Sequence, residues 1–217
     1  PPSSGGGSPR STLATAPARP VWQAESVPLT PRQSEFADAA LRLLARDGMS
    51  SVTFRTVAAE AGLSVGAVQK AFPSKDAMLT AMFARMREAA ASQALGEPGR
   101  PTLQGWLTEL LISVLPLDAP RRAAELQASA FAERAAFDPA IGGAIAASDH
   151  ELTGLIAGLV RRAIGEGEVP RNVDPDAVAR LWLALAQGLA SQLLYDPRPE
   201  EDVRRDARLA IGRLLGS

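Results

Sequence analysis

The stretch of sequence that decides the fold runs from Thr53 to Lys75, TFRTVAAEAGLSVGAVQKAFPSK. It contains two short helical patterns, each too short to be stable alone, joined by a tight Gly-Leu-Ser turn. Ala58 must be small because the second helix crosses there, and Gly62 suits a turn residue with positive φ. This spacing predicts two helices at a steep angle, so that the second can enter a DNA major groove while the first crosses the backbone.

The outer side of the second helix is small or polar, which suits close contact with DNA. Val65 and Ala67 are placed to meet a thymine methyl group, and Gln69 is placed to hydrogen-bond a base edge or a phosphate. Ser64 and the free N–H groups at the helix start suit a phosphate. The predicted DNA-contacting residues are Arg55, Ser64, Val65, Gly66, Ala67, Gln69, Lys70 and Lys75.

Helix signals recur along the rest of the chain. Thr30-Pro31 opens a helix that Gly48 stops, while Asp138-Pro139 and Asp174-Pro175 open two more. Strand alternation is not evident, so the expected fold class is all-α with about nine helices. We expect a flexible tail over residues 1–29, a three-helix helix-turn-helix DNA-binding domain over 30–76, and a helical ligand-binding and dimerisation domain over 77–217.

Composition excludes several kinds of site. The chain has no cysteine and a single histidine, His150, so we expect no disulfide, thiolate zinc site, cysteine nucleophile, all-histidine metal site or cofactor. None of the common phosphate-loop, dinucleotide or hydrolase motifs is present, so we do not expect an enzyme. No secretion signal or membrane-length apolar run is visible, which predicts a cytoplasmic protein that does not enter a membrane. The net charge of −1 does not by itself favour nucleic acid.

The run Arg32–Met82 resembles the tetracycline-repressor (TetR) family. The motif residues are Thr53, Val57-Ala58, Ala61-Gly62-Leu63-Ser64, Gly66, Phe72 and Lys75. The sequence departs from the family at Gln69, where tyrosine is usual, and at Ala71, where histidine is frequent, and both usual side chains tend to hold the DNA backbone. The resemblance implies a homodimer on a roughly palindromic operator, with repression relieved when a small-molecule effector enters the C-terminal domain.

The helix expected over residues 176–195 is apolar on most sides and should not face water. Either the monomer buries it completely or a second subunit covers the remaining face, and the resemblance favours the second subunit, with the last helix completing the contact. The predicted dimerisation residues are Leu181, Trp182, Leu185, Leu189, Val203, Ala207, Ile211 and Leu214.

Aromatic and apolar residues on the middle helices suit a pocket for a small hydrophobic effector, although each of them also fits an ordinary core. The candidate pocket residues are Met82, Trp106, Leu110, Phe131, Phe137 and His150. If the pocket exists, its effector would tilt the helix over residues 75–95 that bridges the two domains. The alternatives are an enzyme, and a helical small-molecule-binding or interaction module with weak or lost DNA binding.

Overall fold

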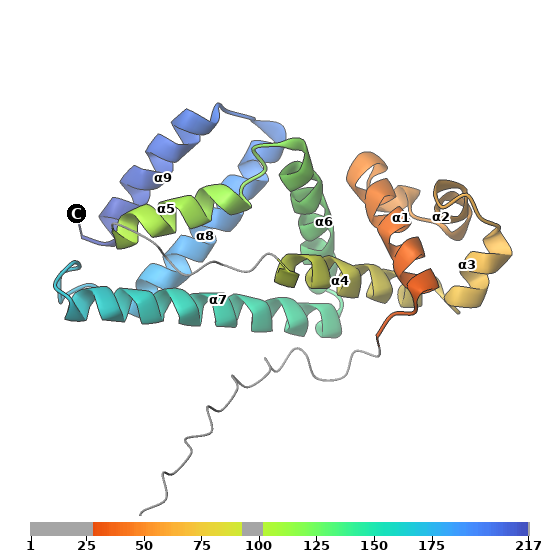
Figure 1. Cartoon of the computed structure of the whole chain (residues 1–217), viewed down its shortest axis with the longest axis horizontal. Helices are drawn as coiled ribbons and strands as arrows, with labels where there is room; N and C mark the ends of the chain where they lie inside the picture. The colour runs from red at the N-terminus through yellow and green to blue at the C-terminus, as the bar shows by residue number, and fades with distance from the viewer. Residues whose placement is uncertain (1–27, 93–101, 217) are drawn as a thin grey trace, which may run out of the picture.

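The computed structural model describes residues 28–92 and 102–216 (Figure 1). Within those residues the secondary structure consists of nine α-helices and one 3₁₀ turn, with no strand, which confirms the all-α prediction. The predicted tail over residues 1–29 lies outside the described residues except for its last two positions.

The N-terminal part of the structure contains four helices and the 3₁₀ turn. They are α1 (Pro31–Asp47), η2 (Met49–Ser51), α2 (Phe54–Glu60), α3 (Val65–Ala71) and α4 (Lys75–Ser92). The predicted helix start at Thr30-Pro31 is confirmed and takes the form of a capping box: Thr30 accepts from the Gln33 backbone N–H, and the Gln33 side chain accepts from the Thr30 backbone N–H. Gly48 ends α1, as expected.

Five longer helices form the C-terminal part. They are α5 (Leu103–Val114), α6 (Ala119–Ala135), α7 (Pro139–Gly165), α8 (Pro175–Tyr195) and α9 (Glu200–Leu214). The two predicted Asp-Pro starts are confirmed, since Asp138 and Asp174 each accept hydrogen bonds from backbone N–H groups in the first turns of α7 and α8. Figure 1 shows α5, α8 and α9 gathered at the end of the molecule far from α2 and α3.

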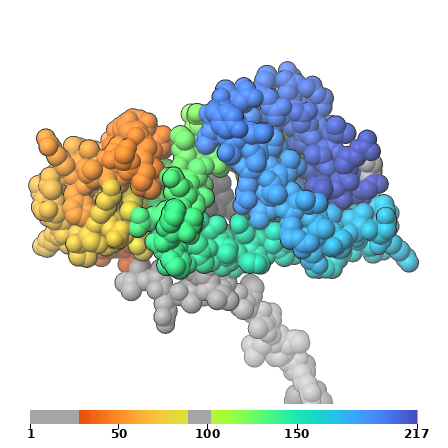
Figure 2. Space-filling view, turned by 180° about the vertical axis from the view of Figure 1, so that it is seen from behind, coloured from red at the N-terminus to blue at the C-terminus, as the bar shows by residue number. Residues whose placement is uncertain are grey.

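The side chains bury two separate cores. The C-terminal core is built from α5, α7, α8 and α9. The N-terminal core is built from α1 to α4, but it also takes in Phe131 from α6 and Ile141 from α7. The rings of Phe83 on α4 and Phe131 on α6 lie 5.2 Å apart, centroid to centroid. The N-terminal core therefore uses residues well beyond position 76. The space-filling view shows α6 between the two ends of the molecule (Figure 2), and Figure 1 shows α7 running on from there along the C-terminal part.

α8 packs against α7, α5 and α9, and its buried side is anchored by Trp182, whose indole N–H donates to the Leu107 carbonyl at 3.1 Å. Its other side is open, and Leu181 is 52% exposed. Among the described residues, α8 is the one helix whose length and mean hydropathy of 1.2 would also suit a membrane span. A core helix of a soluble protein meets the same criteria, and α8 has one face packed in the C-terminal core.

Candidate nucleic-acid interface

The turn between α2 and α3 is held by backbone hydrogen bonds and by one glycine. Gly62 has φ +67°, a conformation that an L-residue adopts only with strain, and the Leu63 N–H donates to the Ala58 carbonyl at 2.9 Å. At the other end of α2, the Thr53 and Thr56 side chains cap each other's backbone N–H groups. These contacts fix both ends of a helix of only seven residues.

α3 is positioned from its start, its buried side and its end. Ser64 accepts from the Ala67 N–H at 3.2 Å. Val68 is fully buried, and Phe72 packs edge-on against Phe36 of α1 with ring centroids 6.4 Å apart. The Gln33 side chain of α1 donates to the Ala71 carbonyl at 3.1 Å. With three such anchors the second helix of the pair is rigidly oriented, as DNA docking requires.

The predicted DNA-contacting residues lie on α2, on α3 with its cap Ser64, and at the start of α4. Seven of the eight are exposed, with Val65 at 39%, and Ala67 is half-buried. The outer face of α3 thus presents small side chains with one amide and one lysine. A face of this kind can approach the edges of base pairs closely.

The cations of this domain fall into two groups. Arg32, Arg42 and Arg46 on α1 are held in ion pairs with carboxylates of the same domain, at 2.8, 3.2 and 3.0 Å respectively. Arg55, Lys70 and Lys75 have no acidic partner among the described residues. The unpaired cations are those already placed on the open face by the sequence, and they remain available to neutralise phosphates.

The ion pairs on α1 also fasten α2 to it. Glu60 receives Arg42 at 3.2 Å through one carboxylate oxygen and Arg46 at 3.2 Å through the other. Hydrogen bonds from these two guanidinium groups lower the pKa of Glu60 below its ordinary value. We call this contact between α1 and α2 the back of the helix-turn-helix, where the charges neutralise one another. We call the exposed side that carries Arg55, Lys70 and Lys75 its front.

A hollow of about 390 Å³ lies beside α3, where the start of α1 meets Ala67 and Lys70. Thr30, Arg32 and Gln33 form its other wall. Arg32 and Gln33 were not among the predicted contact residues, because nothing in the local sequence shows that the start of α1 lies next to the end of α3. The hollow brings a second cation to the same face as Lys70.

The predicted effector residues do not gather in one cavity. Met82 and Phe131 are fully buried in the N-terminal core, whereas Leu110 belongs to the C-terminal core and Trp106 packs against it. Phe137 is 87% exposed in the turn between α6 and α7. His150 is exposed, and its Nδ1 lies 2.6 Å from the Ala146 carbonyl of its own helix. The role of these residues in effector binding stays a prediction. Trp106 lies on α5 and His150 on α7, two helices of the C-terminal part.

Four of the predicted dimerisation residues are enclosed within the protomer. Trp182, Val203, Ala207 and Ile211 are at most 1% exposed, so they hold α8 and α9 to their own core and offer no surface to a partner. Leu181 is exposed, and Leu185, Leu189 and Leu214 are partly so. Spacing predicted an apolar stripe on α9, but it could not show that this stripe faces the protomer's own α5 and α8.

Two half-buried carboxylates in the C-terminal domain were not predicted. Glu125 on α6 accepts from Ser129 at 2.9 Å, and Asp149 on α7 accepts from Gln187 of α8 at 3.5 Å. Burial raises the pKa of both carboxyl groups above their ordinary values, and neither has an ion-pair partner among the described residues. A sequence signal was available for Asp149, which lies between Ile145 and Leu152 on one side of its helix, but not for Glu125, whose neighbours one turn earlier are Arg121 and Arg122.

The fold and this face define a helix-turn-helix DNA-binding protein with a separate helical domain behind it. Comparison with known families agrees over most of the chain. Residues 36–82 match the family model of bacterial regulatory proteins of the tetR family. Residues 103–216 match that of the C-terminal domain of BetI-type transcriptional repressors, so the chain belongs to the TetR family of DNA-binding transcriptional regulators.

Individual relatives are more distant. A nicotine-responsive transcriptional repressor, HdnoR of Paenarthrobacter nicotinovorans, is 40% identical over 55 residues, which is 25% of this chain and only 28% of the relative. A putative regulator from Saccharomonospora viridis in complex with choline is 25% identical, with a TM-score of 0.72 over 82% of this chain and 94% of that one. The multidrug-binding protein EbrR, solved with ethidium, is 26% identical, with a TM-score of 0.61 over 85% and 98% of the two chains.

Proposed function

We propose that this regulator is a repressor that binds a roughly palindromic operator as a homodimer and leaves it when a small effector enters the C-terminal domain. The DNA-binding half of this proposal rests on the difference in charge pairing between the front and the back of the helix-turn-helix. On the front, Arg55, Lys70 and Lys75 have no ion-pair partner among the described residues. Arg42 and Arg46 on the back are both paired with Glu60. Residues 30–76 would supply the DNA contacts, and residues 77–217 the effector site and the dimer contact.

The open side of α8 supports the homodimer. Leu181 is 52% exposed, partly exposed Leu185 lies one turn further along α8, and Tyr195 at the end of the helix is 75% exposed. Covering a large apolar side chain contributes about 1.5–3 kcal/mol, so a second copy on this face would be held firmly. Two recognition helices related by a two-fold axis would meet two half-sites separated by about one turn of DNA or a multiple of it.

Gel-shift titration on duplex from the chain's own promoter tests the DNA-binding half. We expect sequence-specific binding that weakens steeply as salt is raised, with two protomers on each duplex. A chain whose affinity is the same for promoter and scrambled duplex would contradict the proposal. That outcome would favour a helical interaction module in which Gln69 and Ala71 mark lost DNA contacts.

An amphiphilic organic cation is the effector class that the C-terminal domain supports best. Glu125 on α6 and Asp149 on α7 are half-buried, and burial penalises their charged forms. A bound cation would relieve that penalty, while the apolar residues around it would hold the rest of the molecule. Choline and ethidium, bound by the two related structures, are both organic cations.

Calorimetry with choline and with its neutral carbon isostere 3,3-dimethyl-1-butanol tests this effector class. We expect only the cation to bind, and Glu125→Gln or Asp149→Asn to weaken it by about tenfold or more. Glu133→Gln is a matched control, because Glu133 is exposed on the same helix as Glu125. Equal binding of the neutral isostere would show that charge plays no part in effector choice.

A further inference from the structure

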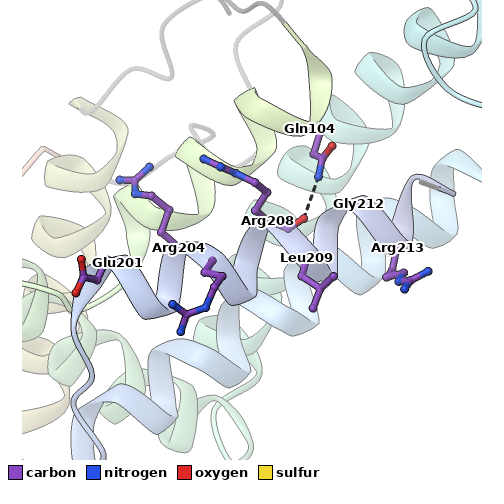
Figure 3. Close-up of a pocket in the computed structure, with 8 residues that line it drawn as sticks. Gln104, Glu201, Arg204, Arg208, Leu209, Gly212 and Arg213 are labelled. Carbon is purple, nitrogen blue, oxygen red and sulfur yellow. Dashed lines mark hydrogen bonds between the residues drawn. The ribbon is translucent and has the colours of Figure 1, made fainter.

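Two surface hollows of this protein are each bordered by a glutamine that ties one helix to another. Beside the larger hollow, of about 590 Å³, Gln104 of α5 donates to the Arg208 carbonyl of α9 at 3.0 Å (Figure 3). Beside the smaller one, Gln33 of α1 donates to the Ala71 carbonyl of α3 at 3.1 Å. The second of these contacts holds the helix that faces DNA.

The two carbonyls differ in what their own helix can offer them. Arg208 lies inside α9, where a carbonyl accepts from the backbone N–H one turn further on. Ala71 is the last residue of α3, and the carbonyls in the last turn of an α-helix have no partner within that helix. Pro73 keeps α3 from continuing. The Gln33 amide therefore gives the end of α3 a hydrogen bond that the helix itself cannot supply.

Both ends of the Gln33 amide are in use. Its Oε1 accepts from the Thr30 backbone N–H at 3.0 Å, which is the capping contact of α1, while its Nε2 donates to the Ala71 carbonyl. Glutamate would cap α1 equally well and would interact more favourably with the positive end of the helix dipole. The described first turn of α1 nevertheless holds no acidic residue. The donor of the amide, which a carboxylate lacks, is what distinguishes glutamine at this position.

The contact at Ala71 bears on the orientation of the residues that face DNA. Val68, one turn earlier, is fully buried, but apolar packing has no preferred direction and leaves a short helix room to rotate. A hydrogen bond is directional, so the Gln33 amide fixes the rotation that Val68 leaves open. Gln69 and Lys70 directly precede Ala71 and are exposed. Recognition groups must be held to within about half an ångström, and a small rotation of α3 would displace both side chains by more than that.

We propose that Gln33 is a positioning residue for operator recognition, which acts through the Ala71 carbonyl to orient α3 on the DNA. The inference rests on the proposed operator binding and adds a residue outside the helix-turn-helix that sets its selectivity. Sequence is recognised through contacts with bases, whereas binding to any duplex depends on contacts with phosphates. Loss of the Gln33 donor should therefore lower operator affinity about tenfold and leave the affinity for a scrambled duplex unchanged.

Two substitutions separate the donor of Gln33 from its capping role. Gln33→Glu keeps the acceptor for the Thr30 N–H and loses the donor to Ala71, so its unfolding temperature should stay close to that of the wild type while its preference for the operator falls about tenfold. Gln33→Met loses the donor without adding charge and should show the same loss of preference. Arg32→Gln is the matched control, because it changes the charge of the same hollow by the same amount as Gln33→Glu and leaves the Ala71 contact in place. It should weaken binding to operator and to scrambled duplex alike.

Fluorescence anisotropy on promoter and scrambled duplexes at one salt concentration gives the ratio of the two affinities, and thermal unfolding followed by circular dichroism checks the fold of each variant. A ratio that stays at the wild-type value in both Gln33 variants would show that Gln33 only caps α1, and would overturn the positioning role while operator binding stands. A fall in the ratio for Arg32→Gln as large as that for Gln33→Glu would assign the effect to charge and would overturn it too. A wild-type chain with no preference for the operator would overturn the proposed function itself.

Discussion

Lys75 offers the sharpest test of the DNA-binding face. It is exposed at the first position of α4 and has no acidic partner among the described residues. Each phosphate neutralised by a cation contributes about 0.9 to the slope of log affinity against log salt on duplex DNA. In a dimer Lys75→Gln removes two such contacts, so the slope should become shallower by about 1.8. Raising salt from about 50 to about 200 mM should then weaken the wild type about twelvefold more than the variant.

Fluorescence anisotropy on a labelled operator duplex, repeated at several potassium chloride concentrations, measures this slope. Arg42→Gln is the matched control, since Arg42 belongs to the same domain but is held by Glu60 on the back of the helix-turn-helix. Its slope should equal that of the wild type. If Lys75→Gln kept the wild-type slope, or if Arg42→Gln lost as much as Lys75→Gln, free and paired cations would be equivalent and the assignment of the DNA face would be refuted.

Three further perturbations follow from the same geometry. Gly62→Ala should lower the free energy of unfolding, measured in urea, by about 1–2 kcal/mol, because φ is +67° although no atom lies within 4 Å of the added methyl group. Gly66→Ala is the control, because its φ is ordinary and the same change should not destabilise the fold there. Phe131→Ala should lower stability by about 3–5 kcal/mol, since the ring is fully buried against Phe83; a loss below about 1 kcal/mol would show that the ring is not a core residue. Glu60→Gln should destabilise the domain near neutral pH and converge with the wild type in acid. The lowered pKa of Glu60 means that its ion pairs stabilise the fold above the ordinary carboxyl pKa, and that this stability is lost as pH falls through the lowered value. A stability difference that persisted below that value would show that the ion pairs are not its source.

Local chemistry made the helix boundaries predictable. Thr30, Thr53 and Ser64 cap α1, α2 and α3, and such caps can be read from sequence because capping depends on residues only two or three positions away. The turn at Gly62 was predictable for the same reason, since one residue type tolerates the required φ. The DNA face followed from these boundaries, because the faces of two short helices are determined once their ends and their crossing angle are known.

Contacts between distant elements were not predictable. Helical periodicity identifies the buried side of α6, but it does not say which neighbour covers each turn. Phe131 of α6, for example, belongs to the same core as α1 to α4, a contact that its own helix does not reveal. Periodicity likewise predicted the apolar side of α9 that includes Val203. It could not reveal that this side is buried in the protomer's own core and that the charged side of α9 is exposed.

The position of α6 changes how an effector signal would reach the DNA. A mechanism based on the sequence passes it through α4 alone, because α4 bridges the two domains in the chain. In the structure α6 also touches the DNA-binding domain directly: Gln127 donates to the Leu41 carbonyl of α1 at 3.1 Å, and Arg134 is paired with Asp76 of α4 at 2.9 Å.

Gln127 and Arg134 lie on either side of Phe131 along α6, so the second half of α6 packs with the domain that holds the recognition helix. The first half of α6 carries Glu125, and its Arg122 donates to the Leu194 carbonyl near the end of α8. A single rigid helix thus joins a half-buried carboxylate of the sensing domain to the core behind α3. An effector that preferred a shifted α6 would move the DNA-binding domain with it, and its differential affinity for the two positions would set how strongly it weakens operator binding.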